Sequence, residues 1–176
     1  KNKIKKIDVF FSMYLGGYVY NLDYLFKLKK KYRFRLIEDA CHALGSTYII
    51  NKNKYKVGSC KYSDIATFSF HPLKSITTGE GGAVCTNFKY IDDRINFYRS
   101  HGIKRNKSSH WKYDVVLNGN NYRLSDINCA LGSSQLAQIN SFLKKRKKIY
   151  SLYFREFENF SENLKLVSQN NKNINS

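Results

Sequence analysis

The first forty residues follow two patterns of apolar and polar positions. The mostly apolar run 8–14 predicts a buried strand that leads into the Gly16-Gly17 pair. Segment 22–31 predicts a helix, because its last turn is basic and its apolar residues recur at helical spacing (Leu22, Leu25, Phe26 and Leu28). A second apolar run, 34–37, predicts another strand. A strand, a helix and a strand in this order indicate the parallel crossover unit of an α/β sheet.

The middle of the chain predicts a second pair of strands. Segment 65–70 consists mostly of residues that favour strands, and 81–86 predicts a second strand. The two flank the polar loop 71–80 as a hairpin-like pair. After them, the apolar residues of 91–100 recur every three or four positions, which predicts a helix.

The last third predicts one long helix over 124–152, with Ser125 positioned to cap its start. The basic run 144–148 within it is typical of a solvated helix face. We expect one domain over 1–160 and a polar C-terminal tail over 161–176 that frays.

The charge balance of the chain invites a second interpretation. With 176 residues and 42% hydrophobic content, the chain has enough apolar material for a core, which excludes a disordered tail. Lys and Arg total 31 against 13 Asp and Glu, a net charge of +18 that attracts polyanions. The 23 Lys outnumber the 8 Arg, however, and 18 Asn accompany them, which favours compositional drift. We therefore expect no nucleic-acid partner. A basic nucleic-acid-binding module stays as an alternative, which predicts a steep loss of affinity with salt.

The cysteines and the chain ends bear on the location and extent of the protein. The four cysteines are far apart without a CxxC pair, and no two histidines stand at i, i+4, so no metal site is expected. Because the sequence shows no signal-like segment and no apolar run of membrane-spanning length, we expect a cytoplasmic protein without a membrane partner. The sequence begins with Lys1, and we expect it to be part of a longer protein.

Four residues are candidates for chemistry, each with an ordinary structural alternative. Asp39 ends a predicted parallel strand, where it can pair with a protonated ring nitrogen or cap a helix. Lys74 lies in the loop between two strands and is either a desolvated amine nucleophile or a surface lysine. Ser69 can bind a phosphate or satisfy the backbone at a strand end. His42 can contact a bound ring or be a satisfied, half-buried histidine.

The order of these residues is more specific than any one of them. The sequence resembles the pyridoxal-phosphate-dependent nucleotide-sugar aminotransferases, the DegT/DnrJ/EryC/StrS family of fold type I, and within it the members of the pseudaminic acid route. The matching stretches are Glu38-Asp39-Ala40-Cys41-His42-Ala43-Leu44-Gly45, Phe68-Ser69-Phe70-His71-Pro72-Leu73-Lys74, Thr77-Thr78-Gly79-Glu80-Gly81-Gly82-Ala83-Val84, Arg99-Ser100-His101-Gly102-Ile103 and Asn121-Tyr122-Arg123-Leu124-Ser125-Asp126.

The resemblance implies a role for each matching position. Lys74 would bind pyridoxal 5'-phosphate through its amine and shuttle protons, and Asp39 would pair with the pyridinium nitrogen. His42 stands in the place of a glutamine common in the family, beside the cofactor ring. Ser69 would bind the cofactor phosphate, and Asn121 would reach the phosphate in the neighbouring subunit of a homodimer.

The resemblance also implies a fold and substrates. It implies the central part of an α/β large domain over 1–160, three-layer α/β/α with a mostly parallel sheet. The implied reaction is transamination of a UDP-linked 4-keto-6-deoxy-hexose with glutamate as the amino donor. Family members are considerably longer, and this sequence lacks their N-terminal phosphate turn and their C-terminal small domain. A truncated, catalytically inactive remnant is therefore an open alternative.

Overall fold

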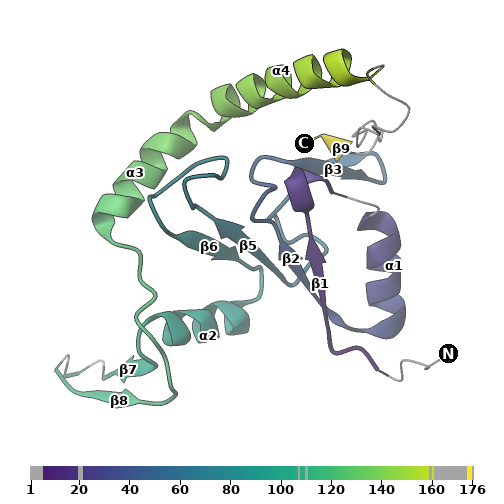
Figure 1. Cartoon of the computed structure of the whole chain (residues 1–176). Helices are drawn as coiled ribbons and strands as arrows, with labels where there is room; N and C mark the ends of the chain where they lie inside the picture. The colour runs from purple at the N-terminus through teal and green to yellow at the C-terminus, as the bar shows by residue number, and fades with distance from the viewer. Residues whose placement is uncertain are drawn as a thin grey trace.

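The computed structural model describes residues 6–19, 22–106, 108–109, 111–158, 160 and 174–175. Figure 1 shows a twisted sheet with α1 beside it and with α3 and α4 extending as an arc. In chain order the elements are β1 (Val9–Met13), the 3-10 turn η1 (Leu15–Gly17), α1 (Leu22–Tyr32), β2 (Arg35–Asp39), β3 (Thr47–Ile50), β4 (Asn53–Lys56), β5 (Ile65–Ser69), β6 (Gly82–Cys85), α2 (Lys89–Arg99), β7 (Ile103–Arg105), β8 (Tyr113–Val115), α3 (Asp126–Ala137), α4 (Ile139–Phe157) and β9 (Ile174–Asn175).

The main sheet has four strands in the order β1-β2-β5-β6. β1 pairs with β2 in parallel from Val9↔Arg35 to Met13↔Asp39, and β2 pairs with β5 in parallel. β6 is antiparallel to β5. The predicted crossover unit and the predicted hairpin-like pair are both confirmed, and the sheet is mostly parallel as expected. The chain is therefore α/β, with its parallel strands all ending at one edge.

The core lies where α1, the sheet and the β3–β4 hairpin meet. β2 contributes Leu36, which is fully buried, and α1 contributes Leu22 at 4% exposure. Phe26 of α1 packs against this core, and its ring lies 6.3 Å from the ring of Tyr48 on β3. Burial of such side chains contributes roughly 1.5–3 kcal/mol each, so this cluster holds the sheet, the helix and the hairpin together.

The β3–β4 hairpin was not predicted from the sequence. Its two-residue turn is Asn51-Lys52, and both residues have positive φ (49° and 64°), as a tight hairpin of this twist requires. The Asn-Lys pair is a weaker signal than Asn-Gly, which explains the omission. Ile174 and Asn175 of β9 pair with the other side of β3. The rest of the predicted tail, 161–173 and 176, lies outside the described residues.

The C-terminal helical region differs from the prediction in one respect. The single helix expected over 124–152 is wrong: the structure has two helices, because Gln138 leaves helical geometry (φ −100°, ψ 0°) and its N–H turns back to the carbonyl of Gln135. The predicted cap is confirmed, since Ser125 Oγ accepts from the N–H of Asn128 at 3.3 Å. The predicted helix over 91–100 is confirmed as α2. None of the helices in the described part of the chain is long and apolar enough to cross a membrane.

Candidate active site

Two candidate residues stand at the same edge of the sheet because their strands are parallel. Asp39 is the last residue of β2, where it pairs with Thr67 of β5. Ser69 is the last residue of β5, two positions further along. Lys74 follows in the connection to β6, which we call the lysine loop (residues 70–81). In open α/β sheets this carboxyl edge is where ligands bind.

The lysine loop is closed by its own backbone. The N–H of Phe70 donates to the carbonyl of Gly81 at 2.9 Å, and the N–H of Thr78 donates to the carbonyl of Phe70 at 3.0 Å. Gly81 has φ of +148°, and a Cβ there would lie 2.6 Å from the hydroxyl oxygen of Thr78. A larger residue at position 81 would therefore open the base of the loop.

Two distant side chains hold the lysine loop from outside. Asn128 of α3 donates its amide to the carbonyl of Thr78. Arg146 of α4 donates from its guanidinium to the carbonyl of Lys74 at 2.9 Å, across 72 residues of sequence. The basic run 144–148 is exposed, as predicted for a solvated face, but Arg146 within it also fixes the backbone of the candidate nucleophile. The main chain of Lys74 is thereby tied to α4.

The half-buried thiol of Cys41 reports on the two charged candidates. Asp39 accepts the backbone N–H of Cys41 at 3.2 Å through its carboxylate oxygen Oδ1. Burial raises the pKa of the Cys41 thiol, and its hydrogen bond to Asp39 and the Asp39 charge raise it further, while the Lys74 ammonium lowers it. Asp39 and Lys74 thus act in opposite directions on the pKa of this thiol. Asp39 at the end of β2 and Lys74 in the lysine loop both follow strands that end at the carboxyl edge of the sheet.

His42 is oriented by the turn that follows β1. The N–H of Gly16 donates to Nδ1 of His42 at 3.1 Å, so the neutral imidazole carries its hydrogen on Nε2. Gly16 has φ of 64°, and at Gly17 a Cβ would lie 2.9 Å from the carbonyl oxygen of His42. The absence of side chains at Gly16 and Gly17 thus permits this turn to approach His42 closely. The Nε2–H of His42 is left as a donor.

Ser69 and Asn121 occupy different parts of the structure. Ser69 is half-buried, and its hydroxyl oxygen accepts the N–H of His71 at 3.3 Å, which leaves the hydroxyl hydrogen for another acceptor. Asn121 is exposed on the segment between β8 and α3, forms a bridge with Ser100 and accepts the N–H of Arg123 at 3.3 Å. Among the described residues, no hydrogen bond or ion pair joins Asn121 to Asp39, Ser69 or Lys74.

A buried polar cluster beneath the edge escaped the sequence analysis. Glu38 is 1% exposed, and burial raises the pKa of its carboxyl group, although the nearby hydroxyl of Tyr14 and the N–H of Gly58 oppose this. Burial together with the Glu38 carboxyl raises the pKa of Tyr14. Glu38 and Asp39 look alike in the sequence, but the alternation of β2 turns Glu38 into the core and leaves Asp39 half-buried at the edge. Of the two, the accessible carboxylate is Asp39.

Comparison with known proteins decides the family. The profile described as the DegT/DnrJ/EryC1/StrS aminotransferase family matches residues 6–176. The chain belongs to this family. It is 49% identical over 143 residues to the UDP-4-amino-4,6-dideoxy-N-acetyl-beta-L-altrosamine transaminase of Campylobacter jejuni, a match that covers 81% of this chain and 36% of that protein. The chain thus spans about a third of the length of this curated relative. The resemblance indicated by the ordered motifs is confirmed.

Solved structures of the family share the fold. PseC of Helicobacter pylori, described as an aminotransferase involved in the biosynthesis of pseudoaminic acid, superposes with a TM-score of 0.76 at 35% identity, covering 85% of this chain and 38% of PseC. The PLP-form of a putative sugar aminotransferase, Spr1654 of Streptococcus pneumoniae, superposes with a TM-score of 0.77 at 26% identity, covering 95% of this chain and 45% of Spr1654. The predicted α/β fold, as a partial large domain, is confirmed.

Proposed function

We propose that the protein containing this chain transfers an amino group from glutamate to a UDP-linked 4-keto-6-deoxy-hexose, in pseudaminic acid or related surface-sugar synthesis, with pyridoxal 5'-phosphate as cofactor. Family membership and the names of the similar proteins support the reaction class and the pathway. The observation that carries the proposal is that Asp39 and Ser69 end the neighbouring parallel strands β2 and β5, with Lys74 held in the loop that follows them.

The chemistry of the sheet edge fits the cofactor. We assign the amine of Lys74 to the aldehyde and the carboxylate of Asp39 to the basic ring nitrogen. The imidazole N–H of His42 matches a ring substituent, and the hydroxyl of Ser69 matches the phosphate. When bound, pyridoxal phosphate supplies an aldehyde that condenses with amines and a ring that withdraws electrons.

In this proposal, residues of this chain hold pyridoxal phosphate in place and transfer protons during the reaction. Asp39, whose Oδ1 accepts the N–H of Cys41, would pair with a protonated ring nitrogen of the bound group. Lys74 accepts and returns a proton at Nζ, on a main chain fixed by Arg146 and by its own N–H bond to the carbonyl of His71 at 2.9 Å. His42 donates from Nε2, because its Nδ1 is occupied by Gly16.

The cofactor site is completed, in this proposal, by a second copy of the chain. Asn121 is exposed, on a segment whose backbone pairs with the end of α2 through Tyr98, Arg99 and Ser100. An exposed side chain on a backbone fixed in this way supports its assignment to the phosphate of the partner site in a homodimer. The homodimer and the cytoplasmic location stay predictions.

Lys74→Ala tests the proposal directly. The purified protein is incubated with pyridoxal phosphate and reduced with borohydride, and the modified lysine is located by peptide mass mapping. We expect stoichiometric labelling at Lys74, its loss in Lys74→Ala, and unchanged labelling in Lys144→Ala, which removes an exposed lysine of α4. Labelling spread over many lysines, or retained in full by Lys74→Ala, would contradict the assignment. Labelling at Lys74 without turnover of glutamate would favour the inactive remnant instead.

A further inference from the structure

A basic cavity lies at the opposite edge of the sheet from Lys74. Its volume is about 820 Å³, within the range of about 300–1,000 Å³ of small-molecule sites. Arg35, the first residue of β2, lines this cavity, whereas Asp39, the last, lies at the candidate active site. Four steps of extended chain separate the two residues by roughly 13 Å, at about 3.3 Å a step. The cavity is therefore a separate site.

The lining of the cavity is strongly positive. It contains six cationic side chains and two carboxylates, Asp23 and Asp64. Asp23 pairs with Lys27 at 2.7 Å, and Asp64 shares its single charge between two cations. Three further cations have no carboxylate partner among the described residues: Lys30, Arg33 and Lys61. A concave surface with this excess of one charge attracts anions.

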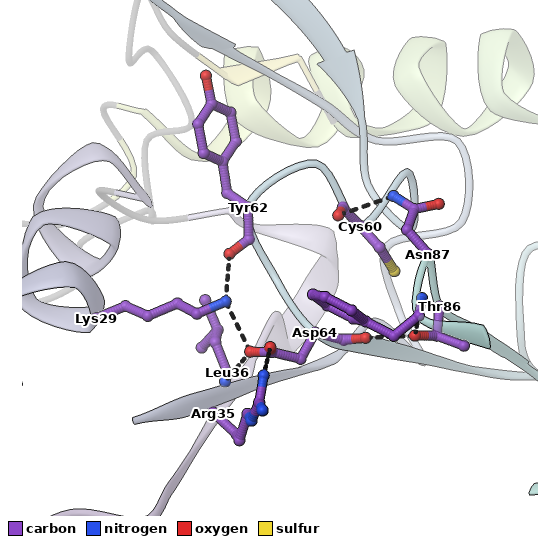
Figure 2. Close-up of polar contacts among 9 residues, drawn as sticks. Lys29, Arg35, Leu36, Cys60, Tyr62, Asp64, Thr86 and Asn87 are labelled. Carbon is purple, nitrogen blue, oxygen red and sulfur yellow. Dashed lines mark hydrogen bonds and ion pairs between the residues drawn. The ribbon is translucent and has the colours of Figure 1, made fainter. Parts of the chain in front are cut away.

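Asp64 fixes two of these cations in place (Figure 2). Its side chain is 2% exposed, and its two oxygens lie 2.7 Å from Nζ of Lys29 and 2.9 Å from the guanidinium of Arg35. It also accepts the N–H of Leu36 at 2.8 Å. Burial works to raise the pKa of Asp64, but these hydrogen bonds outweigh it and the pKa is lowered. The carboxylate stays charged and holds the two cations at the cavity wall.

The held cations keep unused hydrogen-bonding capacity. Lys29 has three N–H donors, and those engaged within the described residues point to Asp64 and to the carbonyl of Tyr62 at 3.0 Å. Arg35 has five donors, of which one is used on Asp64 while Tyr90 also interacts with the guanidinium, so others remain for a ligand. These donors are preorganised for a phosphate, because Asp64 already restricts the conformations of both side chains and less entropy is lost on binding.

Aromatic side chains form another part of the cavity wall. The rings of Phe26 and Tyr62 stack with centroids 4.6 Å apart and an angle of 18° between their planes. Phe88 lies beneath the guanidinium of Arg35 at 5.9 Å. All three line the cavity, so a ligand held by the cations would also meet flat apolar surface.

We propose that this cavity binds a nucleoside phosphate, with the phosphate at Lys29, Arg35 and Lys61 and the base against the aromatic wall. The competing explanation is that the basic last turn of α1 only complements the helix dipole. That explanation accounts for Lys29 and Lys30 but not for Lys61 or for the aromatic rings. The proposal does not depend on the aminotransferase reaction.

The test compares two variants that remove the same charge. Lys30→Gln/Lys61→Gln changes the cavity without disturbing the Asp64 contacts, and Lys144→Gln/Lys147→Gln removes two exposed lysines of α4. Calorimetry measures binding of ADP and of pyrophosphate at low and physiological ionic strength. We expect ADP to bind, with a loss of about tenfold or more in the cavity variant and of less than about twofold in the α4 variant.

Each other outcome counts against the proposal. Equal loss in both variants would mean general attraction of anions, and tighter binding of a single-stranded RNA that both variants weaken would point to a nucleic-acid surface. Pyrophosphate binding as tightly as ADP would contradict the contact with the base. Lys74→Ala is expected to leave ADP binding unchanged. Loss of ADP binding in that variant would place the ligand at the other edge, so the two proposals fail separately.

Discussion

Two parts of the chain are stabilised in different ways. The sheet unit (residues 9–85) contains every buried hydrophobic side chain of the described residues, from Tyr14 to Ile76. The helical arm (residues 89–157) contains α2, α3 and α4, none of which buries a residue. Ile127 of α3 is 84% exposed and Tyr153 of α4 is 59% exposed. The sheet unit is therefore held by apolar burial, and the arm by caps, helical hydrogen bonds and a few polar contacts.

The difference in burial between the sheet unit and the helical arm coincides with different contributions to the candidate active site. The sheet unit carries the candidate catalytic groups Asp39 and Lys74, and burial makes their framework rigid. The arm reaches back with Asn128 and Arg146 to fix the lysine loop by its main chain. The candidate catalytic side chains thus belong to the well-packed part, and the less buried arm holds the lysine loop from outside.

The largest expected effect is in the centre of the sheet unit. Leu36→Ala removes a fully buried side chain from β2 and is expected to lower the free energy of unfolding by about 2–5 kcal/mol. Leu131→Ala, the same change at a residue of α3 that is 43% exposed, is expected to cost under about 1 kcal/mol. Denaturant titration of the two variants measures both values. Similar costs would show that the arm is packed as firmly as the sheet.

A smaller effect is expected at the buried carboxylate of the sheet unit. Asp64→Asn is expected to cost about 1–3 kcal/mol at neutral pH, because it weakens hydrogen bonds to Lys29, Arg35 and Leu36. The pKa of Asp64 is lowered in the folded chain, so its stabilisation is present above the unfolded value near about 3.9 and is lost as the pH falls through the folded value.

Melting temperatures of the wild type and of Asp64→Asn, followed from about pH 7 to below about pH 4, check this dependence. We expect the difference between the two proteins to shrink in acid as the carboxylate of the wild type takes up a proton. A difference that stays constant over this range would show that the Asp64 charge contributes nothing to stability.

The smallest effect is expected in the arm. Ser125→Ala removes the hydroxyl that accepts the N–H of Asn128, a cap worth about 0.5–2 kcal/mol to the helix. Because α3 buries no residue, we expect faster amide hydrogen exchange in its first turn and little change in global unfolding. Ser133→Ala, an exposed position within α3, serves as the control. A full loss of global stability in Ser125→Ala would mean that arm and sheet unit unfold together.

Local signals in the sequence were sufficient for most of the fold. The apolar runs and helical spacing predicted β1, α1 and β2, and the loop between two strands predicted the antiparallel β5–β6 pair. The break at Gln138 and the Asn51-Lys52 turn were missed, because neither uses the residues that most strongly punctuate helices and hairpins. The roles of Lys74, Asp39, His42, Ser69 and Asn121 stay predictions.

By itself, then, the sequence determined the strands of the main sheet and helix α1, the order of the motifs and, through that order, the family. Only the tertiary structure decided that Glu38 is buried while Asp39 faces the edge, that Arg146 holds Lys74, and that Lys61 joins the end of α1 around one cavity. The physical reason is that strand alternation and helix spacing are local properties. Which face is buried, and which distant side chains meet, depends on how the whole chain packs.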